Sequence, residues 1–168
     1  VEDTIMANRF EFAEDDEYRI YINCSRGPLP IYKDILEAKP WVMVLCYPLK
    51  WVLSGVSKFY TSGRPAIIST VGSIPSRFLE NKVKNHCRLS SRMAELEAKR
   101  SDPDAWPLLT DDQGFITEST GANFFCVHHD RLITPEPRNC LRGISRNFVL
   151  WLARKYKVEY RERNIEPY

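Results

Sequence analysis

Two short motifs between residues 117 and 146 combine residue types that could bind a charged cofactor. Glu118 precedes a turn at Gly121, and Gly143-Ile144-Ser145 opens a segment with helical periodicity. A carboxylate such as that of Glu118 can neutralise a protonated ring nitrogen. Free N–H groups at a helix N-terminus can bind a phosphate group. The two motifs therefore predict a ligand that carries both a cationic ring and a phosphate.

The elements that must position these motifs begin with eight short strands, predicted from runs of β-forming residues. They cover residues 18–24, 41–47, 66–71, 105–109, 115–118, 123–127, 131–134 and 158–161. The run from Trp41 to Tyr47 is almost continuously apolar, which predicts burial on both faces of that strand. The four strands from residue 105 to 134 are joined by short polar turns, which favours antiparallel pairing.

Two helices separate these strands. The segment 84–100 carries Leu89, Met93 and Leu96 at helical spacing, with charged residues between them. The second helix covers about 143–156, and one side of it carries Ile144, Phe148, Val149 and Leu152. The resulting order of strands, helix, strands, helix and strand is typical of an α+β fold.

Composition narrows the function class. The chain has 168 residues, 43% of them hydrophobic, and a net charge of +2, with the basic residues scattered. These values fit a globular protein and give no indication of nucleic-acid binding. No apolar run is long enough to span a membrane.

The cysteines and histidines do not suggest a metal site. The five cysteines, at positions 24, 46, 87, 126 and 140, include no C-x-x-C pair. We therefore expect free thiols in a reducing, cytoplasmic setting. His128 and His129 follow Cys126 closely, but no second ligand pair has suitable spacing, so we expect a solvated turn there and no metal.

Four segments together resemble the class IV pyridoxal-phosphate aminotransferases, which include branched-chain aminotransferases, D-amino-acid aminotransferases and aminodeoxychorismate lyases. The segments are Ser25-Arg26-Gly27, Lys84 to Leu89 with the later Glu97-Ala98, Thr117 to Phe125, and Leu141 to Arg146. The resemblance covers nearly the whole chain. It implies the remainder of a small N-terminal α/β domain with a linker over residues 1–75. It also implies a larger cofactor-binding domain over 76–168, C-terminally incomplete and rich in antiparallel strands and helices.

The resemblance also implies roles for individual residues. Lys84 stands where the family has its Schiff-base lysine, with Lys82 as the alternative if the register is shifted. Glu118 corresponds to the acid that pairs with the pyridinium nitrogen of pyridoxal 5'-phosphate, and Asn123 joins the cofactor-binding set.

The remaining implied contacts surround the phosphate and the ring. Gly143, Ile144 and Ser145 correspond to the phosphate-binding turn, where the glycine is expected to allow a tight turn. Leu141 would press on one face of the ring. Arg88 either replaces a tyrosine that contacts the ring hydroxyl in other members or is an exposed helix charge.

The resemblance implies transfer of an amino group between a branched-chain-like amino acid and a 2-oxo acid, usually by a homodimer. Two alternatives stay open, an aminodeoxychorismate-type lyase and an inactive truncated fragment. The missing initial Met and the absent flanking motifs lead us to expect a fragment. D-specific members place an arginine where this chain has Ile31, so we expect an L-amino acid substrate.

Overall fold

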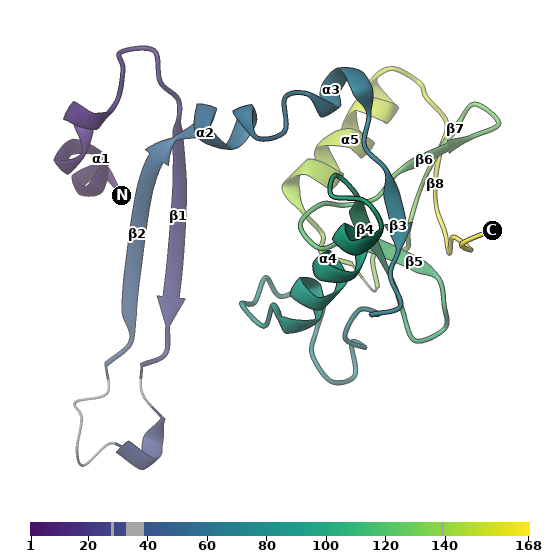
Figure 1. Ribbon diagram of the computed structural model, residues 1–168, viewed down its shortest axis with the longest axis horizontal. Coiled ribbons are helices and arrows are strands. Elements are labelled where there is room, and N and C mark those ends of the chain that lie inside the picture. The colour runs from purple at the N-terminus through teal and green to yellow at the C-terminus, as the bar shows by residue number, and fades with distance from the viewer. Residues whose placement is uncertain (28, 33–38, 139) are drawn as a thin grey trace. The chain divides into compact units, whose positions relative to one another are not determined.

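The computed structural model describes residues 1–27, 29–32, 39–138 and 140–168. The chain divides into two compact units, Val1–Gly63 and Arg64–Tyr168, which are described separately (Figure 1). Strand β3 (Ala66–Ile68) pairs with β4 and therefore lies within the second unit. The division of the chain into domains at residue 75 stays a prediction.

The first unit is built on a two-stranded antiparallel ribbon. Strands β1 (Tyr18–Ser25) and β2 (Trp41–Pro48) pair over their full lengths, with Tyr18 opposite Pro48. The unit also contains the short helices α1 (Glu2–Ala7), η1 (Arg9–Glu11), η2 (Pro30–Tyr32), α2 (Leu49–Ser54) and α3 (Phe59–Ser62). Both strands lie where the sequence predicts them. The expected burial of β2 on both faces is wrong, because only Pro48 of its eight residues is buried.

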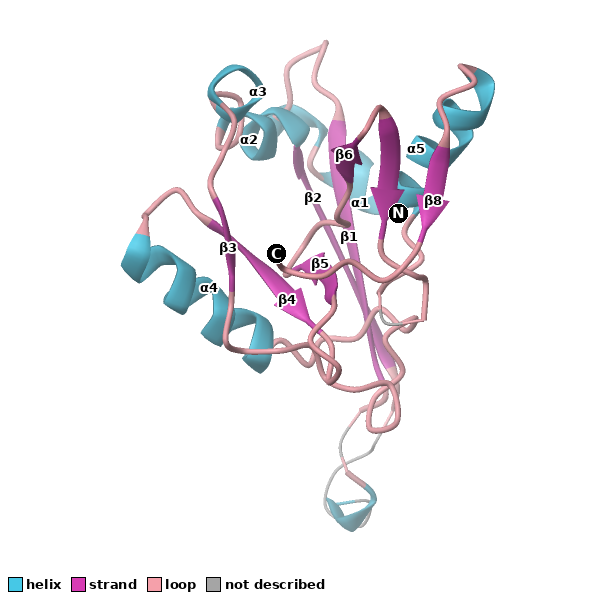
Figure 2. Ribbon diagram, turned by 90° about the vertical axis from the view of Figure 1, so that its right-hand side faces the viewer, coloured by secondary structure: helices cyan, strands magenta, loops and turns pink. Residues whose placement is uncertain are grey.

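The second unit contains two small sheets of the same design (Figure 2). In the first sheet, β3 pairs in parallel with β4 (Trp106–Thr110), and β4 pairs antiparallel with β5 (Ile116–Ser119). Helix α4 (Leu89–Ser101) connects the two parallel strands and packs against β4. Parallel neighbours need such a crossover, whereas antiparallel neighbours need only a short turn.

The second sheet repeats this arrangement in a different order. Strands β6 (Cys126–His128) and β7 (Arg131–Thr134) form a hairpin, and β7 pairs in parallel with β8 (Tyr160–Glu162). Helix α5 (Ile144–Lys155) provides the crossover. The strands and longer helices of the described residues confirm the predicted α+β class, although the sheets combine parallel with antiparallel pairs.

Helix α4 begins later than the sequence predicts, at Leu89 instead of Lys84. The Asn85 side chain accepts a hydrogen bond from the Cys87 N–H at 2.8 Å, and the Asn85 N–H donates to the Val83 carbonyl. Such local bonds compete with helix formation. Lys84 therefore lies in a loop that leads into the helix.

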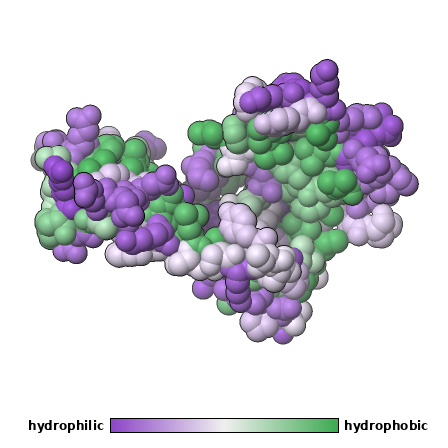
Figure 3. Space-filling model, turned by 90° about the horizontal axis from the view of Figure 1, so that it is seen from above, coloured by the Kyte–Doolittle hydropathy of each residue, from purple (hydrophilic) through white to green (hydrophobic). Residues whose placement is uncertain are grey.

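The buried face of α4 is not the apolar stripe that its periodicity suggests. Ala94 and Ala98 are fully buried, while Leu89, Met93 and Leu96 are each at least half exposed. Small side chains let the helix approach β4 closely, and the larger ones occupy the outer face. Large apolar side chains of other elements are exposed too, and Figure 3 shows apolar residues at the surface.

Helix α5 likewise buries a different face from the one that its apolar periodicity suggests. Its buried residues are Arg146, Leu150 and Ala153, whereas Ile144 and Phe148 are exposed. Neither of these helices, nor any other in the described part of the chain, has the length and apolar character required to cross a bilayer.

The packing of α4 can be tested by comparing Ala98→Leu with Leu96→Ala. Enlarging the fully buried Ala98 should lower the free energy of unfolding by about 1–3 kcal/mol, because the close helix–sheet contact has no room. Truncating Leu96, which is 51% exposed, should change it by only about 0.5 kcal/mol. Urea unfolding followed by circular dichroism measures both. A larger loss for Leu96→Ala would show that the apolar stripe faces inward.

Candidate functional site

The site is organised around the carboxylate of Glu118, which is half-buried near the end of β5. Its Oε2 accepts two hydrogen bonds, from the Asn123 side-chain amide and from the Leu141 backbone N–H, each at 3.2 Å. Glu118 and Asn123 also form an isolated antiparallel bridge across the intervening turn. The carboxylate is therefore held in one orientation by two different segments of the chain.

Asn123 joins these segments through both hydrogens of its amide. Its Nδ2 donates to Glu118 and also to the Leu141 carbonyl, at 2.9 Å. Its Oδ1 would lie 2.9 Å from a Cβ added to Gly143. Glu118, Asn123, Leu141 and Gly143 thus form one contiguous group, called here the Glu118 cluster.

The cluster explains the glycine at position 143. We expected Gly143 to permit a tight turn, but its φ of −67° and ψ of 153° are accessible to any residue. The constraint is one of space, because a side chain would displace the Asn123 amide. The glycine keeps the start of α5 close to the group that holds Glu118.

Burial raises the pKa of Glu118 above its ordinary value. The Leu141 N–H, the positive charge of Lys84 and the Asn123 amide act in the opposite direction, and Arg88 adds a smaller effect. Because desolvation is the largest influence, the surroundings of Glu118 disfavour the ionised carboxylate. A cation placed against Glu118 would favour ionisation and would itself be bound more strongly.

The start of α5 offers donors for an anion beside this carboxylate. Gly143 is the N-cap residue, and no side chain of the described residues caps the helix. The first bond of the helix runs from the Asn147 N–H to the Gly143 carbonyl at 3.1 Å. The N–H groups of the first turn, which include those of Ile144 and Ser145, precede this bond and point out of the helix end.

The two candidate lysines differ in their surroundings. Lys82 lies 3.6 Å from Glu80, which holds its ammonium group in an exposed ion pair. Lys84 is exposed in the same loop, and its charge acts on Glu118. Of these two lysines, Lys84 is therefore the one that is electrostatically linked to the Glu118 cluster.

Arg88 ties the loop before α4 to the turn after Glu118. It is the N-cap residue of α4, and its guanidinium donates to the Thr120 carbonyl. The Thr120 hydroxyl donates to Glu95 of the same helix at 2.9 Å. These bonds connect the segment that carries Lys84 with the turn that carries Glu118 and Asn123.

Arg146 has a structural role that the sequence did not indicate. Its side chain is only 3% exposed and donates to Glu162 of β8 at 2.7 Å and to the Pro135 carbonyl at 2.9 Å. These bonds anchor the first turn of α5 to the sheet. The pattern Arg146, Leu150 and Ala153 is the signal that marks the buried face, but an arginine is normally assigned to the surface.

The sequence matches a known protein family over its full length. Residues 1–168 match the family model described as Amino-transferase class IV. A protein of Methanocaldococcus jannaschii with a provisional branched-chain-amino-acid aminotransferase name is 32% identical over 128 residues, which cover 76% of this chain and 42% of the relative.

Solved structures share the fold. A branched-chain amino acid aminotransferase from the organism abbreviated T.th., complexed with N-(5'-phosphopyridoxyl)-L-glutamate, matches 99% of this chain and 52% of its own, with a TM-score of 0.77 and 21% identity. The Thermoproteus uzoniensis branched-chain aminotransferase with norvaline gives a TM-score of 0.78 at 20% identity, over 99% and 54% of the two chains. These matches confirm the expected fold. The chain spans about half the length of these proteins.

The close contact in the Glu118 cluster predicts different effects for two glycines. Gly143→Ala should lower the free energy of unfolding by about 1–2 kcal/mol, because the new methyl group displaces the Asn123 amide from its hydrogen bonds. Gly121→Ala is the matched control, since no described residue lies within 4 Å of an added Cβ there. Thermal and urea unfolding measure both variants. Equal effects would mean that the contact does not constrain Gly143.

Proposed function

The chain belongs to the class IV aminotransferase family, and we propose that it carries the pyridoxal-phosphate site of an amino-group transferase. The proposed reaction moves an amino group between a branched-chain-like amino acid and a 2-oxo acid. The observation that carries the proposal is the oriented, half-buried Glu118 beside the uncapped start of α5. This pairing offers a carboxylate for a cationic ring and N–H groups for a phosphate.

The proteins that are similar to this chain give further support to the proposal. The T.th. enzyme binds a phosphopyridoxyl group joined to glutamate, and the Thermoproteus uzoniensis enzyme was solved with norvaline. Both are branched-chain aminotransferases by name, as is the Methanocaldococcus jannaschii relative in its provisional name. The branched-chain type is therefore the first substrate class to test.

Bound pyridoxal 5'-phosphate supplies an electron sink that stabilises negative charge at the substrate α-carbon. In the proposal, the Glu118 carboxylate keeps a proton on the ring nitrogen, which maintains that electron-withdrawing power. The hydrogen bonds from Asn123 and Leu141 fix the direction of the carboxylate. Their loss would leave the charge in place but misdirect it.

The first turn of α5 would hold the phosphate. The N–H groups of Ile144 and Ser145 donate from the helix end, and the Ser145 hydroxyl adds a third donor. Leu141, which is half-buried next to Glu118, supplies an apolar surface for one face of the ring. Arg88 acts at a distance by holding the turn at Thr120.

Lys84 would provide the amine. Its Nζ would hold the cofactor covalently and would also serve as the base that takes the proton from the substrate α-carbon. An exposed lysine needs a less polar setting to act as a base near neutral pH. Filling the site with cofactor and substrate would provide that setting.

The substrate side and the assembly are further parts of the proposal. Ile31 lies where D-specific members have an arginine, which favours an L-amino acid with an apolar side chain; Pro28, in the same stretch, lies outside the described residues. We also propose a homodimer in a reducing cytoplasm, where the free cysteines would stay reduced. Transamination of L-leucine or L-valine would support this interpretation, and pyruvate release from aminodeoxychorismate would favour the lyase.

Covalent trapping tests the proposed site directly. Incubation of the chain with pyridoxal 5'-phosphate, followed by borohydride reduction, should attach a pyridoxyl group to Lys84, which peptide mass spectrometry would identify. Lys84→Arg should abolish the label at this position. Lys82→Arg is the matched control and should retain it, because Lys82 pairs with Glu80.

The distribution of the label decides between the alternatives. Label on Lys82 would show that the register is shifted by two residues. Label spread over many exposed lysines would show that the chain has no organised cofactor site and would favour the inactive fragment.

A further inference from the structure

The β6–β7–β8 sheet has one face turned away from α5. On β8, the Tyr160 ring lies 5.9 Å from the Arg154 guanidinium carbon of α5, and Glu162 pairs with Arg146 of α5. Side chains alternate between the faces of a strand. Arg161, between these two residues, therefore belongs to the opposite face.

The strand register places further basic side chains on that same face. His128 lies opposite Arg131, and Ile133 lies opposite both Cys126 and Arg161. Arg163 follows Arg161 by two residues, and its N–H donates to the Thr134 carbonyl, which extends the pairing beyond β8. Basic residues from all three strands or their ends thus share one surface.

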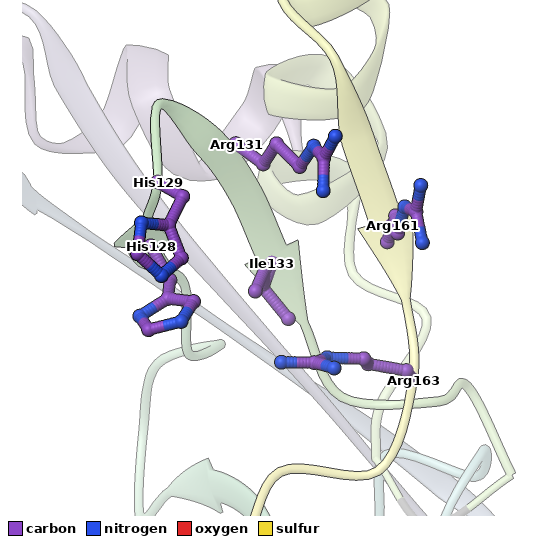
Figure 4. Close-up of a pocket in the computed structure, with 6 residues that line it drawn as sticks. All are labelled: His128, His129, Arg131, Ile133, Arg161 and Arg163. Atoms are coloured by element: carbon purple, nitrogen blue, oxygen red, sulfur yellow. The ribbon is translucent and has the colours of Figure 1, made fainter.

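A cavity of about 240 Å³ lies over this surface (Figure 4). It is lined by His128, His129, Arg131, Ile133, Arg161 and Arg163. In the close-up, the Arg163 side chain extends below Ile133 towards the two histidines. A pocket of this volume has room for a small hydrated ion.

The charges in this cavity are not balanced by acids. Glu159 accepts from Arg131 at 2.8 Å and from Arg161 at 3.1 Å, so one carboxylate serves two guanidinium groups. Among the described residues, no acidic side chain lines the cavity. No residue that the structure describes forms a hydrogen bond or an ion pair with the Arg163 guanidinium. Three arginines and one glutamate leave a charge of +2 before the histidines are counted.

The neighbouring thiol does not supply the missing negative charge. Burial raises the pKa of Cys126, and the charge of Arg163 only partly opposes this effect. The thiol therefore stays neutral beside the arginine. Asp130 belongs to the adjoining hairpin turn but does not line the cavity.

We propose that this cavity is a second binding site that takes a compact dianion, such as a phosphate group or a short dicarboxylate. Arg163 provides the main contact, because its guanidinium can donate two parallel hydrogen bonds to a carboxylate or to two oxygens of a phosphate group. His128 and His129, whose rings lie 4.1 Å apart, form the opposite wall and add donors. The cavity shares no residue with the Glu118 cluster or with the start of α5. It is therefore separate from the proposed cofactor site.

The test follows amide chemical shifts of the ¹⁵N-labelled chain during titration with inorganic phosphate at constant ionic strength. Saturable shifts should occur along β6, β7 and β8. Arg163→Gln should weaken the binding roughly ten- to hundredfold, the loss expected for charge-assisted hydrogen bonds. Arg100→Gln is the matched control, because it removes the same charge from an exposed position on α4 and should leave the affinity unchanged.

A parallel titration with succinate separates the two sources of the dianion. Saturable shifts at the cavity with either ion support the proposal. The ion that binds with the higher affinity shows whether the natural dianion is a phosphate or a dicarboxylate. The proposal is overturned if shifts appear only at the start of α5, if neither ion saturates, or if Arg100→Gln weakens binding as much as Arg163→Gln. Loss of the cofactor site alone, as in Lys84→Arg, should not alter these shifts.

Discussion

A half-buried carboxylate must be hydrogen-bonded, and that requirement on Glu118 organises the second unit of this chain. Desolvation raises the pKa of Glu118, so the folded protein bears a cost for keeping it ionised. The Leu141 N–H and the Asn123 amide reduce this cost, and they come from segments that follow β5 and precede α5. The same bonds bring the start of α5 to the carboxylate.

Residues of α4 and α5 hold Glu118 and the start of α5 in place. Arg88 and Glu95 of α4 bond to Thr120 in the turn beyond Glu118. Arg146 anchors the first turn of α5 to β8 through Glu162. Arg146 is buried, so removal of Glu162 would leave its charge without this partner, and the pair ties the start of α5 to β8. The site therefore depends on contacts that touch no ligand.

The sequence predicted much of this because the informative motifs are local. Strands, the two long helices and the residues of the Glu118 cluster are recognisable from short segments, and the fold and family are confirmed. The predicted start of α4 was wrong because the Asn85 side chain competes with the helix. The buried helix faces were wrong because close packing selects Ala94 and Ala98, whereas periodicity emphasises large apolar residues.

Arg146 and the spatial role of Gly143 were missed for a related reason. Both depend on a partner far away in the sequence, Glu162 for the arginine and Asn123 for the glycine. Pairings of this kind follow from tertiary structure, not from local propensity. The basic cavity on the β6–β7–β8 sheet was likewise hidden, because the register that gathers its residues is a property of the sheet.

Glu118 is, in this interpretation, a desolvated carboxylate whose proposed partner is a cationic ring. Its titration can be followed by ¹³C NMR of the side-chain carboxyl, with Glu118→Gln used to assign the signal. Without cofactor, the measured pKa should lie above the ordinary glutamate value of 4.5. With bound pyridoxal 5'-phosphate, the pKa should fall markedly, because the ring nitrogen then carries the proton. An ordinary pKa in the free chain, or one that cofactor binding leaves unchanged, would contradict this role for Glu118.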